Sequence, residues 1–128
     1  MLPVRYPWVW LSLGWLLVLG VIVGSLVPGE MLRAVTINDK IMHAGAYFVL
    51  MVWFAGLYRR SRHPLIAAVL IALGVGLDML QGATETRTLD ILDIGADAAG
   101  ILAGLLLSVW VLEGWCVRLE RLLVAPAA

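Results

Sequence analysis

Charged side chains are scarce in this sequence: nine lysines and arginines and nine aspartates and glutamates make up 14% of its 128 residues. The balance of charge leaves no basic run of the kind that binds nucleic acid, so we expect no nucleic-acid partner. The single cysteine, Cys116, excludes an internal disulfide and a cysteine-based metal cluster. Motifs such as GxSxG, HExxH and a glycine-rich phosphate loop are absent as well, which gives no support to the familiar hydrolases and nucleotide-binding proteins.

The sequence is rich in apolar residues. They make up 62% of the chain, whereas soluble domains have about 45–50%. A helix needs about 20 apolar residues to cross a membrane. Segments that meet this requirement lie at about 8–28, 41–58, 65–81 and 94–112. We therefore predict an all-α integral membrane bundle of four transmembrane helices that forms a single domain, 1–128.

The first of these segments could also be a signal peptide, because Arg5 precedes it. Its charge-free run from Tyr6 to Gly29 exceeds the roughly 7–15 apolar residues of a signal-peptide core. No small-x-small cleavage site follows. We therefore favour an uncleaved helix.

The distribution of basic residues predicts the orientation. Four spans place both termini on one side of the membrane, and that side carries six of the nine basic residues: Arg5, Arg59, Arg60, Arg62, Arg118 and Arg121. The other side carries Arg33, Lys40 and Arg87. By the positive-inside rule both termini are cytoplasmic. Five of the six tryptophans fall toward the same ends, as an interfacial aromatic belt would.

Polar residues open the second span. Asp39, His43 and Tyr47 are four residues apart and therefore stack on one helix face, with Lys40 beside them. Taken alone, His43 would be interpreted as a helix-end histidine bonded to a carbonyl or water. The stacked neighbours favour a functional site instead.

A second group of polar residues lies at the end of the third span. Asp78 and Gln81 are three residues apart, near one face, and a polar loop from Gln81 to Leu92 that contains Arg87 follows. A carboxylate inside the bilayer costs roughly 2.5–3.5 kcal/mol, so it normally faces the bundle interior and has a partner or a function. Asp78 is therefore a candidate site residue.

The fourth span combines acids and glycines on one stripe. Asp93, Asp97, Gly100 and Gly104 are spaced by four, three and four residues. The glycines form a small-xxx-small pair, which predicts close packing against another helix. Asp97 is expected about 6 Å deeper than Asp93, at 1.5 Å rise per residue.

These polar groups are expected to converge at one external pocket. They could simply pair with one another and set the helix register, or Lys40 and Arg87 could bind an anionic or sugar–peptide head group. His43 with Asp78, Asp93 and Asp97 could hold a divalent cation, or paired carboxylates with His43 could act as acid and base. The spacing matches no recognised metal or hydrolase signature, so we expect no metal or cofactor and favour ligand binding over catalysis.

Two stretches, DKIMHAGAYF and DMLQGATETRTLDILDIGADAAGILAG, resemble the VanZ-like membrane proteins, whose founding member is associated with teicoplanin resistance. The first follows the pattern Asp-Lys-x-x-His-x-x-x-Tyr. The second has an acid three residues before a Gln, then an Arg, an Asp, a polar residue and a Gly. These positions are Asp39, Lys40, His43, Tyr47, Asp78, Gln81, Arg87, Asp93, Asp97 and Gly100.

The resemblance covers residues 39–104, with two departures: Asp78 stands where the family more often has Glu, and Asp97 where it often has Asn. It implies a multi-pass protein of the bacterial cytoplasmic membrane with a role in the cell envelope and in glycopeptide susceptibility. The partners implied are membrane lipid and a lipid-linked cell-wall precursor or lipoglycopeptide. The resemblance implies no mechanism.

The last segment, from Gly114 to Ala128, is interpreted as a short interfacial helix or a continuation of the fourth span. Trp115 and Leu119 fall on one side of it and Arg118 on another. Cys116 is expected to serve as a small apolar residue there.

Overall fold

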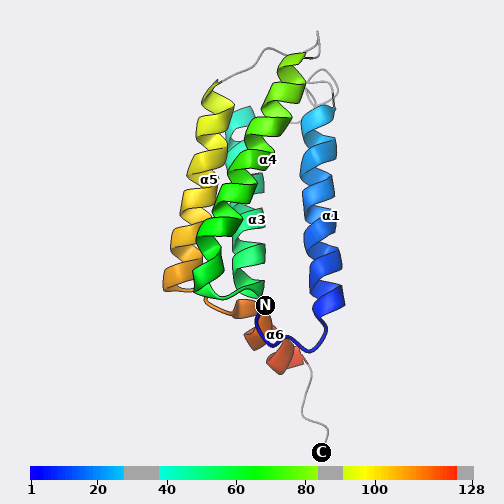
Figure 1. The fold of residues 1–128 in the computed structure, drawn as a ribbon, viewed down its shortest axis with the longest axis vertical. Helices are drawn as coiled ribbons and strands as arrows, with labels where there is room; N and C mark the ends of the chain where they lie inside the picture. Colours follow the sequence, from blue (N-terminus) through cyan, green and yellow to red (C-terminus); the bar gives the residue numbers. More distant parts are fainter. Residues whose placement is uncertain (28–37, 84–90, 124–128) are drawn as a thin grey trace, which may run out of the picture.

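The computed structural model describes residues 1–27, 38–83 and 91–123, and this part of the chain is helical without any strand. Four long helices lie alongside one another (Figure 1). They are α1 (Pro7–Leu26), α3 (Asp39–Leu57), α4 (His63–Ala83) and α5 (Ile91–Trp110), followed by a short α6 (Trp115–Leu123). All four long helices are long and apolar enough to cross a membrane. The predicted all-α fold with four membrane spans is therefore confirmed.

Helix boundaries follow local sequence signals. Pro7 begins α1, where its missing N–H costs nothing, and the side chain of Asn38 caps α3 by accepting a hydrogen bond from the Lys40 N–H at 2.9 Å. Helix α4 continues to Ala83 and α5 begins at Ile91. Both ends of the predicted 81–92 loop are therefore helical, and Gln81 at its start is buried instead of facing water.

The closest helix contact joins α3 to α5. A Cβ atom at Gly100 would collide with the carbonyl oxygen of Ala44, and one at Gly104 would lie 2.9 Å from the carbonyl oxygen of Phe48. The two glycines therefore let the backbones of these helices approach at two successive turns, as the small-xxx-small pair predicts. Below them the interior is filled by apolar residues: Val18, Tyr47, Leu50, Met51, Ala55, Leu70 and Ile101.

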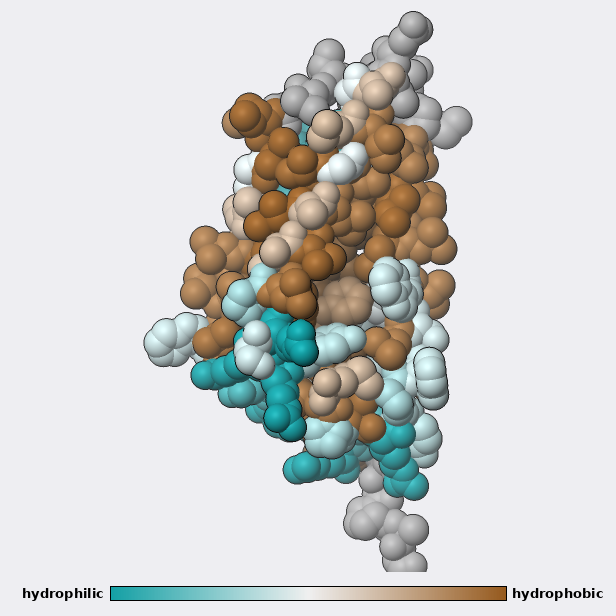
Figure 2. Space-filling model, viewed as in Figure 1, coloured by the Kyte–Doolittle hydropathy of each residue, from teal (hydrophilic) through white to brown (hydrophobic). Residues whose placement is uncertain are grey.

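Apolar residues also cover the outside of the long helices. Figure 2 shows brown hydrophobic surface over most of their length and teal hydrophilic surface toward the end where α6 lies. Large side chains such as Leu16, Ile41 and Leu65 are more than half exposed. Such a surface is unusual for a water-soluble monomer and is suited to contact with lipid.

The end of the bundle near α6 is basic. Arg60 donates a hydrogen bond to the carbonyl oxygen of Val109 and forms an ion pair with Glu113 at 3.0 Å. Arg118 donates to the carbonyl oxygens of Val111 and Glu113 at 3.2 and 3.0 Å. These arginines satisfy carbonyl groups at and just beyond the C-terminal end of α5, where positive charge is favourable.

The tail forms a separate helix and does not continue α5. Gly114 has a φ of 63°, a conformation that glycine adopts without strain, and α6 begins at the next residue. The rings of Trp10, Trp53 and Trp115 pack against one another with centroids 5.5–5.6 Å apart. Cys116 is completely buried beside them. This aromatic cluster joins α6 to α1 and α3.

A buried carboxylate completes that junction. Glu120 accepts hydrogen bonds from the backbone N–H groups of Arg5 and Tyr6, at 2.5 and 2.9 Å, and from the indole of Trp10 at 2.7 Å. Burial disfavours the charged form of Glu120, but these three hydrogen bonds and the charge of Arg5 prevail and hold its pKa below the ordinary value. Glu120 therefore ties the N-terminal segment to α6 as an ionised acceptor.

Candidate functional site

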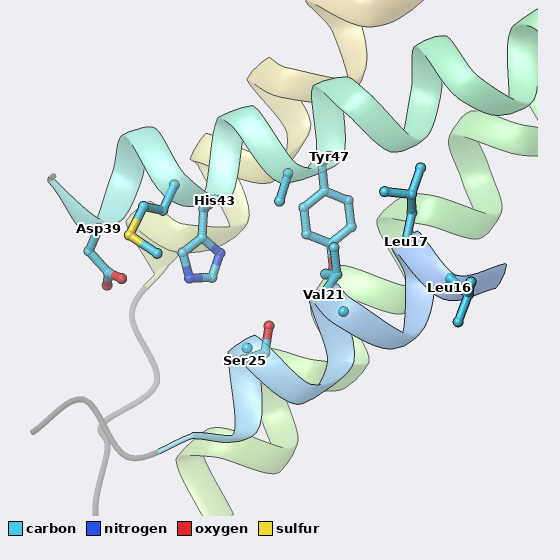
Figure 3. A pocket seen from close by; sticks show the side chains of 11 residues that line it. Leu16, Leu17, Val21, Ser25, Asp39, His43 and Tyr47 are labelled. Carbon is cyan, nitrogen blue, oxygen red and sulfur yellow. The ribbon is translucent and has the colours of Figure 1, made fainter. Parts of the chain in front are cut away.

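The polar residues of α3 lie along one face at the end of the bundle opposite α6. Asp39 is exposed, His43 is half-buried and Tyr47 is buried, so the stripe passes from the helix end into the interior. Figure 3 shows the three side chains projecting from the same side of α3. Their spacing of four residues predicts this arrangement.

One ion pair and one histidine–carboxylate hydrogen bond join this part of α3 to α5. Lys40 pairs with Asp93 in the first turn of α5, and His43 Nδ1 lies 2.9 Å from Asp97 Oδ1, one turn deeper. Both aspartates are buried. The two acids of the predicted α5 stripe therefore face α3 and not the lipid. The two pairs lie on successive helical turns, and the close contact of Gly100 with Ala44 lies directly beyond them.

Helix α4 adds a third acid to the cluster. One ligand atom each from His43, Asp78 and Asp97 lies within 4.8 Å of the others, and Asp78 is buried. One turn away on α4, a Cβ atom at Gly74 would lie 2.6 Å from Asp97 Oδ2 and 3.3 Å from the hydroxyl of Tyr47. Glycine at this position therefore makes room for both polar groups against α4.

A cavity of about 370 Å³ opens beside the cluster, between α1 and α3. Its lining is mostly apolar, and Asp39, His43 and Ser25 lie toward one end, whereas Tyr47 lies beside Val21 (Figure 3). The full lining is Leu16, Leu17, Gly20, Val21, Gly24, Ser25, Asp39, Met42, His43, Ala46 and Tyr47. A Cβ atom at Gly20 or Gly24 would meet nothing within 4 Å. The two glycines of α1 therefore help to keep the cavity open.

Six of the nine site residues named from the sequence converge at this end of α3, α4 and α5: Lys40, His43, Tyr47, Asp78, Asp93 and Asp97. Asp39 lies at the cavity mouth. Gln81 is buried, but its amide donates to the carbonyl oxygen of Ser25 at 2.6 Å, so it connects α4 to α1. Arg87 lies outside the described residues.

Sequence reasoning missed the contribution of α1. Its residues Leu17, Val21 and Ser25 line the cavity, yet nothing in the apolar run distinguishes this face from the one that contacts lipid. The pair Gly20 and Gly24 was the available signal. Glu120 was also missed, although it lies four residues after Cys116 and therefore on the same face of α6.

Comparisons with protein-family models, with curated proteins and with solved structures find no match for this chain. The interpretation of the site therefore depends on its residues and their geometry. Among the described residues, Asp39, Asp78, Asp93 and Asp97 lie near Lys40 and His43. Such a site can bind a polar group that brings hydrogen-bond donors to the acids.

Proposed function

We propose that this chain is a VanZ-like protein of the bacterial cytoplasmic membrane that binds the polar part of an amphiphile in the cavity between α1 and α3, and thereby alters susceptibility to teicoplanin. The observation that carries the proposal is the composition of the cavity. Its wall is mostly apolar along α1, and Asp39, His43 and Ser25 lie toward one end (Figure 3). This arrangement matches a molecule with an acyl chain and a polar head.

The binding mode follows from the lining. Leu16, Leu17 and Val21 would contact the apolar portion, while Asp39 and His43 would contact the head group. Small-molecule sites are typically concave and apolar with a few polar groups that fix orientation. A lipid-linked cell-wall precursor or a lipoglycopeptide combines both parts in one molecule.

The proposal includes an orientation with both termini in the cytoplasm. The start of α1 and the helix α6 lie at the same end of the bundle (Figure 1), and the arginines at that end favour the cytoplasmic side. The cavity would then open toward the outer leaflet. This is the side on which a lipoglycopeptide meets the membrane.

The test is teicoplanin and vancomycin susceptibility in a sensitive host with an exposed cell wall. Gly24→Leu places a side chain in the cavity, where a Cβ atom meets nothing within 4 Å, and replaces none of the polar residues. Gly76→Leu is the matched control, because a Cβ atom there meets nothing within 4 Å and Gly76 does not line the cavity. Wild type and Gly76→Leu should raise teicoplanin tolerance, and an equally abundant Gly24→Leu protein should not. The proposal fails if wild type has no effect or if Gly24→Leu retains it.

One observation favours a second candidate, a membrane-embedded enzyme that acts on a lipid-linked phosphate or sugar. The Asp97 carboxylate holds His43 by Nδ1, which leaves Nε2 for a second partner, as in histidines that act as general bases. Product formation from such a lipid by the purified protein, lost in Asp97→Asn, would favour this candidate over binding alone.

A further inference from the structure

We propose that His43, Asp78 and Asp97 form a binding site for one divalent transition-metal ion, with Zn²⁺ as the ion to test. The inference goes beyond the proposed function, because metal binding requires no amphiphile and can be measured without one. It also revises the expectation from the sequence, in which the ligand spacing matched no recognised metal motif.

The first argument is geometric. The three side chains come from α3, α4 and α5, and their ligand atoms lie within 4.8 Å of one another. Around a tetrahedral Zn²⁺ with ligands at about 2.0–2.2 Å, neighbouring ligand atoms are about 3.3–3.6 Å apart. The side chains would have to rotate to reach this separation. Because the ligands come from three helices, no short sequence motif could have indicated the site.

The second argument is an unsatisfied oxygen. Asp97 is only 3% exposed; its Oδ1 atom contacts His43, but its Oδ2 atom has no hydrogen-bond partner among the described residues. This atom faces α4 at Gly74, one turn from Asp78. A buried carboxylate oxygen without a partner is costly, and an unseen ion is one recognised explanation. A metal between α3 and α4 would satisfy it.

The third argument is charge balance. Asp78 and Asp97 are buried within 4.8 Å of each other, where two ionised carboxylates repel strongly. A divalent ion bound with a neutral imidazole would balance both charges.

The ligand set also selects the type of ion. One imidazole nitrogen and two carboxylates suit Zn²⁺ and related first-row ions, whereas Ca²⁺ takes six to eight oxygen ligands. A shallower set, Asp39, His43 and Asp93, is also close enough to share an ion. Asp39 is exposed and Asp93 is engaged by Lys40, so we assign the ion to the deeper set.

The experiment uses the full-length protein in detergent after treatment with a chelator. Zn²⁺ binding is measured by calorimetry, and Co²⁺ binding by its visible absorption, which reports the number and type of ligands. Asp97→Asn and His43→Gln test the site. Asp39→Asn removes a ligand of the shallower set alone and therefore distinguishes it from the set of His43, Asp78 and Asp97. Glu113→Gln replaces an exposed acid at the opposite end of the bundle and is the matched control.

We expect one Zn²⁺ per chain, with affinity reduced at least about tenfold in Asp97→Asn and His43→Gln and unchanged within about twofold in both controls. Equal losses in Asp39→Asn and Asp97→Asn would overturn the deep assignment. Absence of Zn²⁺ and Co²⁺ binding by the wild type would overturn the site, whether or not the variants fold. The amphiphile proposal is tested separately by Gly24→Leu, which leaves all three metal ligands in place.

Discussion

His43 and Asp97 meet across the α3–α5 interface, with Nδ1 of the imidazole 2.9 Å from Oδ1 of the carboxylate. The pair depends on the backbone contact at the next turn, where Gly100 lies directly against the carbonyl of Ala44. A bulkier residue at position 100 would separate the helices and lengthen the hydrogen bond. The packing motif and the polar site are therefore parts of one interface.

Removing the Asp97 carboxylate should destabilise the bundle. Leaving a buried hydrogen-bonding group without its partner typically costs about 1–3 kcal/mol, so we expect Asp97→Ala to lower the free energy of unfolding by roughly this amount. Asp97→Asn should cost less, because the amide oxygen still accepts from His43 Nδ1–H. Unfolding in a mixed-micelle denaturant titration measures both. Equal stability of Asp97→Ala and wild type would show that the pair contributes nothing.

Gly100→Ala should weaken the α3–α5 contact. Its Cβ atom would collide with the Ala44 carbonyl, and overpacking of this kind costs about 1–3 kcal/mol. Gly45→Ala on α3 is the matched control, since a Cβ atom there meets nothing within 4 Å, and alanine is the better helix former. We expect a lower unfolding midpoint for Gly100→Ala alone. A loss of the same size in Gly45→Ala would assign the effect to glycine replacement in general.

The sequence was informative where a polar or small residue interrupts an apolar helix. The spacing of Asp39, His43 and Tyr47, and the stripe that contains Asp97, predict which faces point inward, and the structure places them so. The rest depends on which helices are neighbours. One partner of Gln81 is a backbone carbonyl on α1, which no side-chain pattern records. The uniformly apolar α1 likewise carries no periodicity that marks its cavity face.

Docking of α6 should depend on pH through Glu120. Its pKa in the folded protein lies below the ordinary value of 4.5, so its stabilising effect is fully present above about pH 4.5 and is lost as the pH falls through the lowered folded-state pKa. The near-UV circular dichroism of the Trp10–Trp53–Trp115 cluster should therefore decrease on acidification. Glu120→Gln should start with a weaker signal and lack this acid step. An identical acid step in the variant would contradict the assignment.

Cys116 should be inert toward thiol reagents while α6 is docked. The side chain is completely buried, and burial raises the pKa of its thiol to about 12, so almost no thiolate exists at pH 8. Maleimide labelling should be slow in wild type and much faster in Glu120→Ala, in which α6 loses its acceptor. A Ser61→Cys thiol, exposed at the same end, serves as the positive control. Rapid labelling of wild-type Cys116 would show that α6 is not docked.

The orientation can be determined with two single cysteines in a Cys116→Ala background. Ile91 begins α5 at the polar-cluster end and is 75% exposed, whereas Ser61 is exposed at the arginine-rich end. If the arginines face the cytoplasm, a membrane-impermeant maleimide added to intact cells should label Ile91→Cys and leave Ser61→Cys unlabelled until the cells are opened. The reverse pattern would place the cavity on the cytoplasmic side. A cavity on the cytoplasmic side could not bind an antibiotic that reaches the membrane from outside. This result would therefore contradict both the predicted orientation and the teicoplanin proposal.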